Sequence, residues 1–382
     1  MTGKNGWILG ILLAILLSGG VALADEPIRI GAIFSVTGPA SFLGEPERNT
    51  AKMLEEDINK SGGLLGRKVE IIVYDDETDA TKAVTALDRL IKKDKVVAII
   101  GPSTSGNTLA IMPKVDEAKV PLVSCSAAKK IVQPARPYVF KVVPSDILAV
   151  KKIFLHAKKA GISKIAILTA SDGYGAGGRE DMKELAPQMG IAIVADEVYG
   201  PKDTDMTAQL TKIKGTDAQA IVCWGTNPGP AVIARNRVQL GIKTPLYMSS
   251  GVASKKFIEL AGAENAEGIL LPAGRLIVEP QVPASNLQKK VLSSYIKEYE
   301  KKFNQPVSTF GGHAYDAIRV LELAMKNGKS AEPSAIRDAL EKIKGYQGTA
   351  GEFNFSPDDH SGLTEEGFVM VKIVKGDWEM QK

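Results

Sequence analysis

Two predicted strands end in segments of small hydroxyl-bearing residues, and such segments suit the binding of an anion. The apolar runs 96–100 and 120–123 each lead directly into a segment of this kind. A helix that begins there has free N–H groups in its first turn, and these favour negative charge. Ligands of open α/β sheets bind at the carboxyl ends of the strands. The candidate residues are Ser103, Thr104 and Ser105 in the first segment, and Ser126, Ala127 and Ala128 in the second.

An alternation of strand and helix patterns positions these two segments. Helical periodicity of this length between strands requires parallel pairing with right-handed crossovers. We therefore expect an α/β fold with two doubly wound parallel-sheet lobes. The strands are expected at 28–34, 68–74, 96–100, 120–123 and 138–142 in one block, and at 164–169, 191–198, 218–223, 246–248 and 268–271 in the other. Helices are expected at 43–60, 81–93, 147–160 and 230–240, with a glycine-rich turn at 171–175.

The last hundred residues do not form an obvious third domain. Three helical segments, 285–303, 310–326 and 334–343, precede a β-rich tail at 367–374. We expect them to complete the two lobes, so that the chain crosses between lobes more than once. The expected division is 25–144 plus about 274–345 for lobe I, and 145–273 plus about 346–382 for lobe II.

Residues 1–24 predict a secretory signal peptide. Lys4 supplies a positive charge, the apolar segment 7–17 is too short to span a membrane, and 22–24 fits a small-x-small cleavage site. No later stretch of about eighteen apolar residues appears, so a soluble protein of the periplasm is expected. No cysteine follows the cleavage site directly, so no lipid anchor is expected.

Size and composition exclude several classes of protein. A chain of 382 residues exceeds one ordinary core, so two domains are expected. The 48 basic and 44 acidic residues are mixed along the chain without a basic block, so no nucleic-acid partner is expected. Cys125 and Cys223 fall in different predicted lobes, which favours two buried thiols over a disulfide.

Cofactor, catalytic and metal motifs are not supported. The glycines at 173–178 lack the dinucleotide spacing, and no phosphate-loop motif exists. No nucleophile elbow is present, and His156, His313 and His360 lie in unrelated contexts: His156 is expected within a helix and His360 in a polar loop. The acidic segment 75–79 lacks the glycine and the terminal glutamate of a calcium loop, and fits a turn that caps the next helix. No cofactor, metal site or enzymatic activity is expected.

Five segments carry a resemblance to a known family: 30–39 (IGAIFSVTGP), 57–66 (DINKSGGLLG), 99–103 (IIGPS), 172–175 (DGYG) and 313–317 (HAYDA). With them, the mature sequence resembles a type I periplasmic substrate-binding protein of the branched-chain amino-acid (leucine/isoleucine/valine) transporter family. The resemblance implies two hinged lobes, a ligand held between them, and an inner-membrane ABC permease as partner. A monomer is expected from it. A periplasmic sensor subunit that reports a solute to a regulator stays open as an alternative.

The resemblance also implies which residues hold the ligand. The hydroxyl of the first segment and the groups of the second segment match those that bind the ligand carboxylate. An aromatic residue closes the site from the far lobe, and residues of the first loop face the ligand side chain. The implied positions are Ser105, Ser126, Ala128, Tyr174, Thr226 and Ser250, with Phe42 or Leu43 in the first loop.

Two departures from the family pattern concern the ligand ammonium. Amino-acid binders of the family usually have threonine at Ala128 and glutamate at Ser250, and these groups receive the ammonium. An ammonium buried without a counter-charge costs several kcal/mol. The hypothesis is therefore a carboxylate without an α-ammonium, such as an aromatic or short aliphatic acid. Asp172 in place of the glutamate would restore amino-acid binding.

The side chain of such an acid needs an apolar wall. Phe42, Tyr174 and Trp224 are the predicted apolar or stacking groups. Lys129 is expected to be an exposed loop lysine rather than a source of positive charge in the site.

Overall fold

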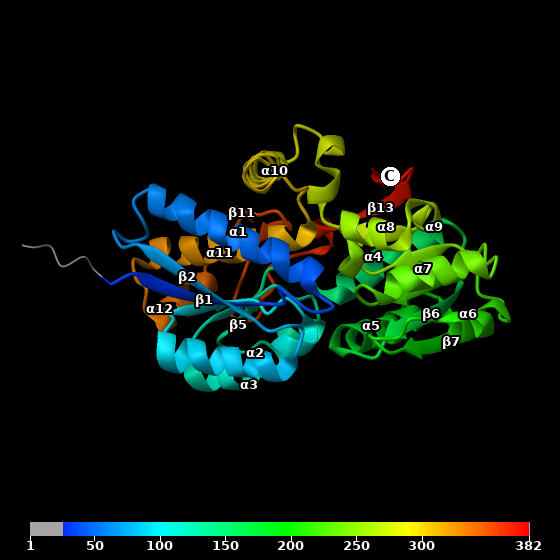
Figure 1. The fold of residues 1–382 in the computed structure, drawn as a ribbon, viewed down its shortest axis with the longest axis horizontal. Helices are drawn as coiled ribbons and strands as arrows, with labels where there is room; N and C mark the ends of the chain where they lie inside the picture. Colours follow the sequence, from blue (N-terminus) through cyan, green and yellow to red (C-terminus); the bar gives the residue numbers. More distant parts are fainter. Residues whose placement is uncertain (1–25, 382) are drawn as a thin grey trace, which may run out of the picture.

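The computed structural model describes residues 26–381, and the predicted signal peptide 1–24 lies outside these residues. Figure 1 shows two α/β halves side by side along the long axis of the molecule. Within residues 26–381, no helix combines the length and the hydropathy that a membrane crossing needs.

The first lobe is built on a five-stranded parallel sheet in the order β2-β1-β3-β4-β5. Its helices α1 and α11 lie on one face, and α2 and α3 lie on the other (Figure 1). The strands are β1 (Ile28–Phe34), β2 (Val69–Asp75), β3 (Ala98–Ile100), β4 (Leu122–Ser124) and β5 (Val139–Lys141). The helices are α1 (Ser41–Lys60), α2 (Ala80–Arg89), α3 (Ser105–Ala118), α10 (Lys289–Phe303), α11 (Thr309–Gly328) and α12 (Pro333–Leu340).

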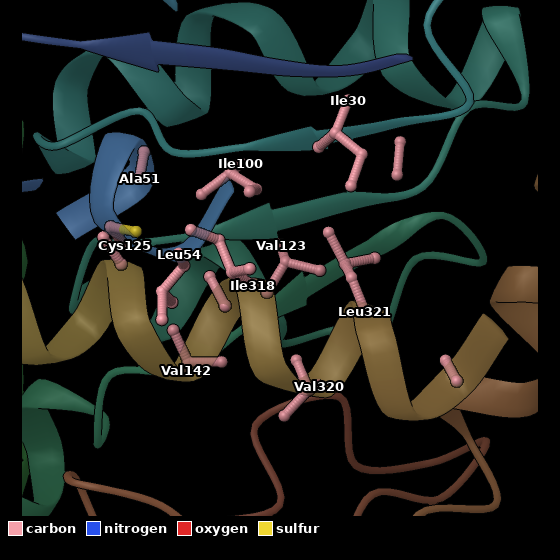
Figure 2. Close-up of a cluster of buried hydrophobic side chains, with 14 of the residues drawn as sticks. Ile30, Ala51, Leu54, Ile100, Val123, Cys125, Val142, Ile318, Val320 and Leu321 are labelled. Atoms are coloured by element: carbon pink, nitrogen blue, oxygen red, sulfur yellow. The ribbon is translucent and has the colours of Figure 1, made fainter. Parts of the chain in front are cut away.

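Alternate residues of each strand in this sheet enter two different cores. Ile30 of β1 and Ile100 of β3 pack with α1 and α11, whereas Ile33 and Ile99 pack with α2 and α3. Figure 2 shows the first of these cores, in which strand residues meet Leu54 and other side chains of α1 and α11. Because a strand has a side-chain period of two, a sheet covered on both faces needs near-continuous apolar runs, as the sequence has.

The second lobe is built on a seven-stranded sheet in the order β14-β13-β10-β9-β8-β6-β7. Its part β7-β6-β8-β9-β10 repeats the order β2-β1-β3-β4-β5 of the first sheet. The strands are β6 (Lys164–Ala170), β7 (Ala192–Tyr199), β8 (Ala220–Trp224), β9 (Leu246–Met248), β10 (Leu270–Ala273), β13 (Val369–Val374) and β14 (Asp377–Met380). The helices are α4 (Asp146–Lys159), α5 (Gly173–Gln188), α6 (Thr207–Lys214), α7 (Gly229–Gln239), α8 (Lys255–Ala261) and α9 (Ala263–Ala266).

This second sheet is not wholly parallel, in contrast to the prediction. β13 pairs antiparallel with both β10 and β14. Lys375 and Gly376 join β13 to β14 as a two-residue turn, and both have positive φ (52° and 75°). Two consecutive positive φ angles are typical of the turn that closes tight hairpins. The tail therefore adds an antiparallel hairpin to the edge of a parallel sheet.

The chain passes between the lobes after β5, after β10 and again before β13. The short hairpin of β11 (Tyr346–Gln347) and β12 (Glu352–Phe353) precedes the last crossing. Phe353, Phe355 and Leu363 pack in the core of the first lobe. The expected boundary at about 346 is therefore too early, because residues up to about 363 belong to the packing of lobe I. The rest of the predicted division stays a proposal.

Several local predictions differ from the structure. The glycine-rich segment at 171–175 is not a free turn, because α5 begins at Gly173. His360 was expected in a polar loop, but it is buried and stacks on Phe140 with ring centroids 3.9 Å apart. Cys125 and Cys223 are both buried and unbonded, as predicted.

Candidate functional site

A cavity of about 150 Å³ lies between the two sheets. The segments that follow β3 and β4 line it from the first lobe, and those that follow β6, β8 and β9 line it from the second. β1 lies between β2 and β3, and β6 lies between β7 and β8, so both sheets reverse their strand order beside this cavity. A crevice outside the carboxyl ends at such a reversal is the usual ligand site of open α/β sheets.

Most of the predicted ligand residues line this cavity. Ser105 and Ser126, which come from different strand ends, face the same space. The predicted residues around it are Ser103, Thr104, Ser105, Ser126, Ala127, Tyr174, Thr226 and Ser250. Their contact with a ligand stays a prediction.

Phe42 and Ala128 do not line the cavity. α1 begins at Ser41 rather than near Leu43, so Phe42 and Leu43 lie in one helical turn and point in different directions. Leu43 lines the cavity, whereas Phe42 lines a separate hollow and packs edge-on against Phe310 at 5.6 Å. Ala128 is buried, and its N–H donates to Ser105 Oγ at 3.2 Å.

The second hydroxyl segment is already hydrogen-bonded within the protein. Ser126 Oγ donates to the carbonyl oxygen of Pro102 at 2.8 Å and lies 2.9 Å from Thr108 Oγ1. Lys141 Nζ, which is buried, donates to the carbonyl oxygen of Ala127 at 2.7 Å. These bonds fix the segment in place rather than leave its hydroxyl free as a donor.

The free donors at this edge are the first N–H groups of α3. Thr104 is the N-cap, and its Oγ1 accepts from the N–H of Asn107 at 3.4 Å. Ser105 and Gly106 lie in the first turn of the helix, where no carbonyl oxygen one turn earlier can accept from their N–H groups. Within residues 26–381 no hydrogen bond uses these two N–H groups. A carboxylate at this end would meet two N–H donors and the positive end of the helix dipole.

Buried carboxyl groups support the first-lobe wall from behind. Ser103 Oγ accepts from the N–H of Ser35 at 2.9 Å and donates to Glu47. Burial raises the pKa of Glu47 well above its ordinary value. Asp76 accepts from Asn107 Nδ2 at 2.8 Å and so orients an amide that lines the cavity.

The second-lobe wall is positioned by the start of α5. Asp172 is the N-cap, and its Oδ1 accepts from the N–H groups of Tyr174 and Gly175 at 3.0 and 2.8 Å. The Tyr174 hydroxyl accepts from the N–H of Gly251 at 3.1 Å and lies 3.4 Å from Ser250 Oγ. Burial raises the pKa of Tyr174, so this wall presents a neutral phenol.

The predicted aromatic wall is only partly correct. Trp224 is fully buried behind Tyr174, with ring centroids 5.8 Å apart, and does not reach the cavity. Sequence reasoning did not include the residues that replace it, because they come from the crossings and from α11. The additional apolar lining residues are Val143, Phe310 and Phe368.

The electrostatic character of the lining is slightly acidic. Asp172 is its one ionisable carboxylate, and no lysine or arginine contributes to it within the described chain. Lys129 is neither in the cavity nor a free loop residue: its Nζ lies 3.0 Å from Asp181 and 2.5 Å from Glu184, both on α5. Residues 26–381 contain no group of three or more acidic, histidine or cysteine side chains that could hold a metal ion.

The two lobes touch beside the cavity. A Cβ at Gly173 would lie only 3.0 Å from Gly106 Cα, so the starts of α5 and α3 are in close backbone contact. Lys129 and Lys130 of the first lobe pair with acidic residues of α5. Both lobes therefore contribute to the walls of the cavity.

A two-lobed fold that encloses one small cavity of this kind defines a solute-binding protein. The chain belongs to the periplasmic binding protein family, whose model matches residues 27–377. It is 25% identical over 363 residues to a leucine-, isoleucine-, valine-, threonine- and alanine-binding protein of Pseudomonas aeruginosa, covering 94% of this chain and 93% of that one. It is 26% identical to a Leu/Ile/Val-binding protein of Rhizobium johnstonii, with 94% of each chain covered.

Solved structures agree in fold. An extracellular ligand-binding receptor from Rhodopseudomonas palustris HaA2 has a TM-score of 0.88 at 29% identity, covering 94% of this chain and all of that one. A branched-chain amino acid transporter substrate-binding protein of Streptococcus pneumoniae, solved in complex with isoleucine, has a TM-score of 0.82 at 28% identity, with 93% and 98% covered. These likenesses confirm the predicted fold class and the predicted family.

Proposed function

We propose that this chain is the solute-binding component of an ABC importer and that it captures a small carboxylate in the cavity between its lobes. The observation that carries the proposal is the meeting of the starts of α3 and α5 beside a cavity that both lobes line. The free N–H groups of Ser105 and Gly106 supply donors for an anion where no cationic side chain is present. The name of the Streptococcus pneumoniae transporter substrate-binding protein supports a transport role.

The guest favoured here is a carboxylate without an α-ammonium. Ser250 lines the cavity where amino-acid binders of the family carry glutamate, and Asp172 already uses one carboxylate oxygen to cap α5. Leu43, Val143 and Phe310 give the guest an apolar wall. A cavity of about 150 Å³ is large enough to hold a group of the size of a benzene ring.

A second candidate is an α-amino acid, and one observation favours it. Asp172 lines the cavity, and no hydrogen bond within residues 26–381 uses its second oxygen, Oδ2. An ammonium that met this oxygen would have a counter-charge, so its burial would be less costly.

The mechanism is differential affinity for two arrangements of the lobes. The guest contacts both lobes only when the cavity is closed, so binding shifts the population toward the closed form. The closed protein in the periplasm would then dock on an inner-membrane permease as a monomer, without a cofactor.

Calorimetry with benzoate, 4-methylpentanoate and L-leucine tests the proposal, with thermal unfolding as a second readout. A ligand at a hundred times its dissociation constant stabilises the folded state by about 2.7 kcal/mol. We expect at least one of the two acids to bind more tightly than leucine. Preferential leucine binding that Asp172→Asn abolishes would instead establish the second candidate. Failure of these three acids and of their oxygen-substituted counterparts to bind would contradict both candidates.

A further inference from the structure

The first turns of α11 place two polar side chains without partners against the cavity. Thr309 and His313 both line it. Thr309 Oγ1 and His313 Nδ1 are enclosed and have no hydrogen-bond partner among the described residues. Four residues apart on one helix, they lie on the same face and form one patch.

These unpartnered groups are not accounted for by the packing around them. His313 is only 6% exposed, and its nearest ring neighbour is Phe310, whose edge-on contact satisfies neither ring nitrogen. The other buried histidine, His360, has a partner at the same atom, since its Nδ1 lies 2.9 Å from the carbonyl oxygen of Val139, although its Nε2 makes no hydrogen bond among the described residues and lies 3.3 Å from Glu341 Oε1. Buried polar groups are nearly always paired, so two unpaired polar groups on residues that line a cavity point to a missing partner.

The protonation state of His313 limits which chemical groups can serve as the missing hydrogen-bond partner. Burial lowers the pKa of His313 to about 3, so the ring is neutral at physiological pH. A neutral imidazole has one N–H donor and one acceptor nitrogen, and a threonine hydroxyl also donates and accepts. A hydroxyl or a carbonyl oxygen matches both groups, whereas a second carboxylate would find no cation in the lining.

We propose that Thr309 and His313 form a second polar subsite that recognises a neutral oxygen substituent, a hydroxyl or a carbonyl, on the carboxylate guest. This inference rests on the proposed function and narrows its substrate class to oxygen-substituted acids. The subsite is separate from the hydroxyls of the strand ends, because Ser126 Oγ is held by Pro102 and Ser105 Oγ by Ala128. A hydrocarbon acid or leucine would bury Thr309 and His313 without partners. Sites built to bond a substrate hydroxyl can reject the analogue without it by a factor of about 10⁴.

Matched acid pairs test the subsite by calorimetry: 4-hydroxybenzoate with benzoate, 4-methyl-2-oxopentanoate with 4-methylpentanoate, and L-tyrosine with L-phenylalanine. In at least one pair, the oxygen-bearing member should bind the wild-type protein tenfold or more tightly. The first two pairs distinguish a hydroxyl from a carbonyl guest. The third distinguishes an amino acid from an ammonium-free acid.

Two substitutions assign the preference to the patch. Thr309→Val and His313→Phe should each reduce the difference within that pair to less than threefold. Thr207→Val at the first position of α6, outside the cavity, should leave the difference unchanged and serves as the matched control. Thr309→Val keeps the shape of the side chain, so it gives an answer even where His313→Phe fails to fold.

Each result has one meaning. Equal binding within every pair, or a difference that survives both substitutions, would overturn the subsite while the carboxylate receptor stands. Binding by none of the six acids would overturn the receptor proposal and the subsite together.

Discussion

At the scale of single residues, burial shifts the pKa of Glu47, His313 and Asp316, which lie in or behind the first-lobe wall of this cavity. Asp316 of α11 is fully buried and accepts from the N–H of Thr349 at 2.7 Å and from the N–H of Ala350 at 2.8 Å. Thr349 Oγ1 lies 2.9 Å from the same carboxyl group and donates to the carbonyl oxygen of Gly312. One aspartate therefore holds the loop before β12 onto the helix that carries the proposed subsite.

This arrangement predicts a pH dependence of stability. Burial raises the pKa of Asp316 to about 7, above the value of about 3.9 for an unfolded aspartate. The folded state then binds the proton more tightly, so this contribution is fully present below about pH 4 and is lost as the pH rises through 7. The slope from this group is at most about 1.4 kcal/mol per pH unit.

Urea unfolding between pH 4 and 8 measures this slope. Asp316→Asn should flatten the decline in the free energy of unfolding, because the amide does not titrate. Asp358→Asn is the control, since Asp358 is exposed. Parallel pH profiles for the wild type and Asp316→Asn would contradict the assignment.

The sequence could predict some residues of the site because they follow strands. Ser105, Ser126 and Tyr174 come directly after the strands of parallel sheets, whose carboxyl ends meet at one edge, so their convergence follows from the topology. Thr309 and His313 could not be predicted in this way. They reach the cavity only because the chain returns to the first lobe after β10, and no local pattern records which face of α11 meets the other lobe.

At the scale of elements, the contact between α3 and α5 couples the site to closure. Gly106 and Gly173 stand in the first turns of these helices, and a Cβ added at Gly173 would lie 3.0 Å from Gly106 Cα, closer than an ordinary contact. Gly175 is needed for a different reason: its Cβ would lie 2.0 Å from the carbonyl oxygen of Ala170. The glycine-rich segment is therefore a packing requirement of a helix start rather than a flexible turn.

Gly173→Ala is expected to weaken ligand binding about tenfold, which corresponds to about 1.4 kcal/mol. The added methyl group would press on Gly106 only when the lobes are closed, so the unfolding of the ligand-free protein should change by less than about 0.5 kcal/mol. Calorimetry and thermal unfolding measure the two effects. Gly177→Ala in the same helix is the control, because its Cβ would be 3.8 Å from Ala128 Cβ, an ordinary contact. Equal affinities for the two variants would count against a closure-dependent contact.

The sequence could not predict where helices and strands begin and end accurately enough to assign every residue that lines the cavity. The apolar periodicity placed α1 and its strand neighbours well, because each has a buried face. It predicted the start of α1 two residues too late. Because the helix begins at Ser41, Leu43 lines the cavity and Phe42 points away from it. The antiparallel hairpin of β13 and β14 depends on pairing with β10, which lies about a hundred residues earlier.

At the scale of the whole molecule, the two lobes share one strand order, and each lobe presents the corresponding edge of its sheet to the cavity. Each sheet reverses its strand order beside the cavity, so neither lobe alone encloses the guest. The balance between open and closed forms then depends on contacts between the lobes. These contacts include the ion pairs of Lys129 and Lys130 with acidic residues of α5.

These two neighbouring lysines should differ in their effect on closure. Lys129 pairs at 3.0 Å with Asp181, whose side chain is 3% exposed, whereas Lys130 and Glu180 are each 58% exposed. A buried carboxylate that loses its partner is costly, whereas an exposed ion pair contributes about 0–1 kcal/mol. Lys129→Met should therefore open the lobes and weaken binding of the best acid by tenfold or more, and Lys130→Met should change it by less than threefold.

Small-angle scattering with and without that acid separates closure from binding. The Lys129→Met protein should be more extended than the wild type at equal acid concentration and should reach the compact form only at higher concentration, because the lost ion pair acts on the closed state alone. Lys130→Met should follow the wild-type curve. If both variants followed it, Asp181 would tolerate burial without Lys129, and the contacts between Gly106, Gly173 and the guest would be sufficient to hold the lobes together.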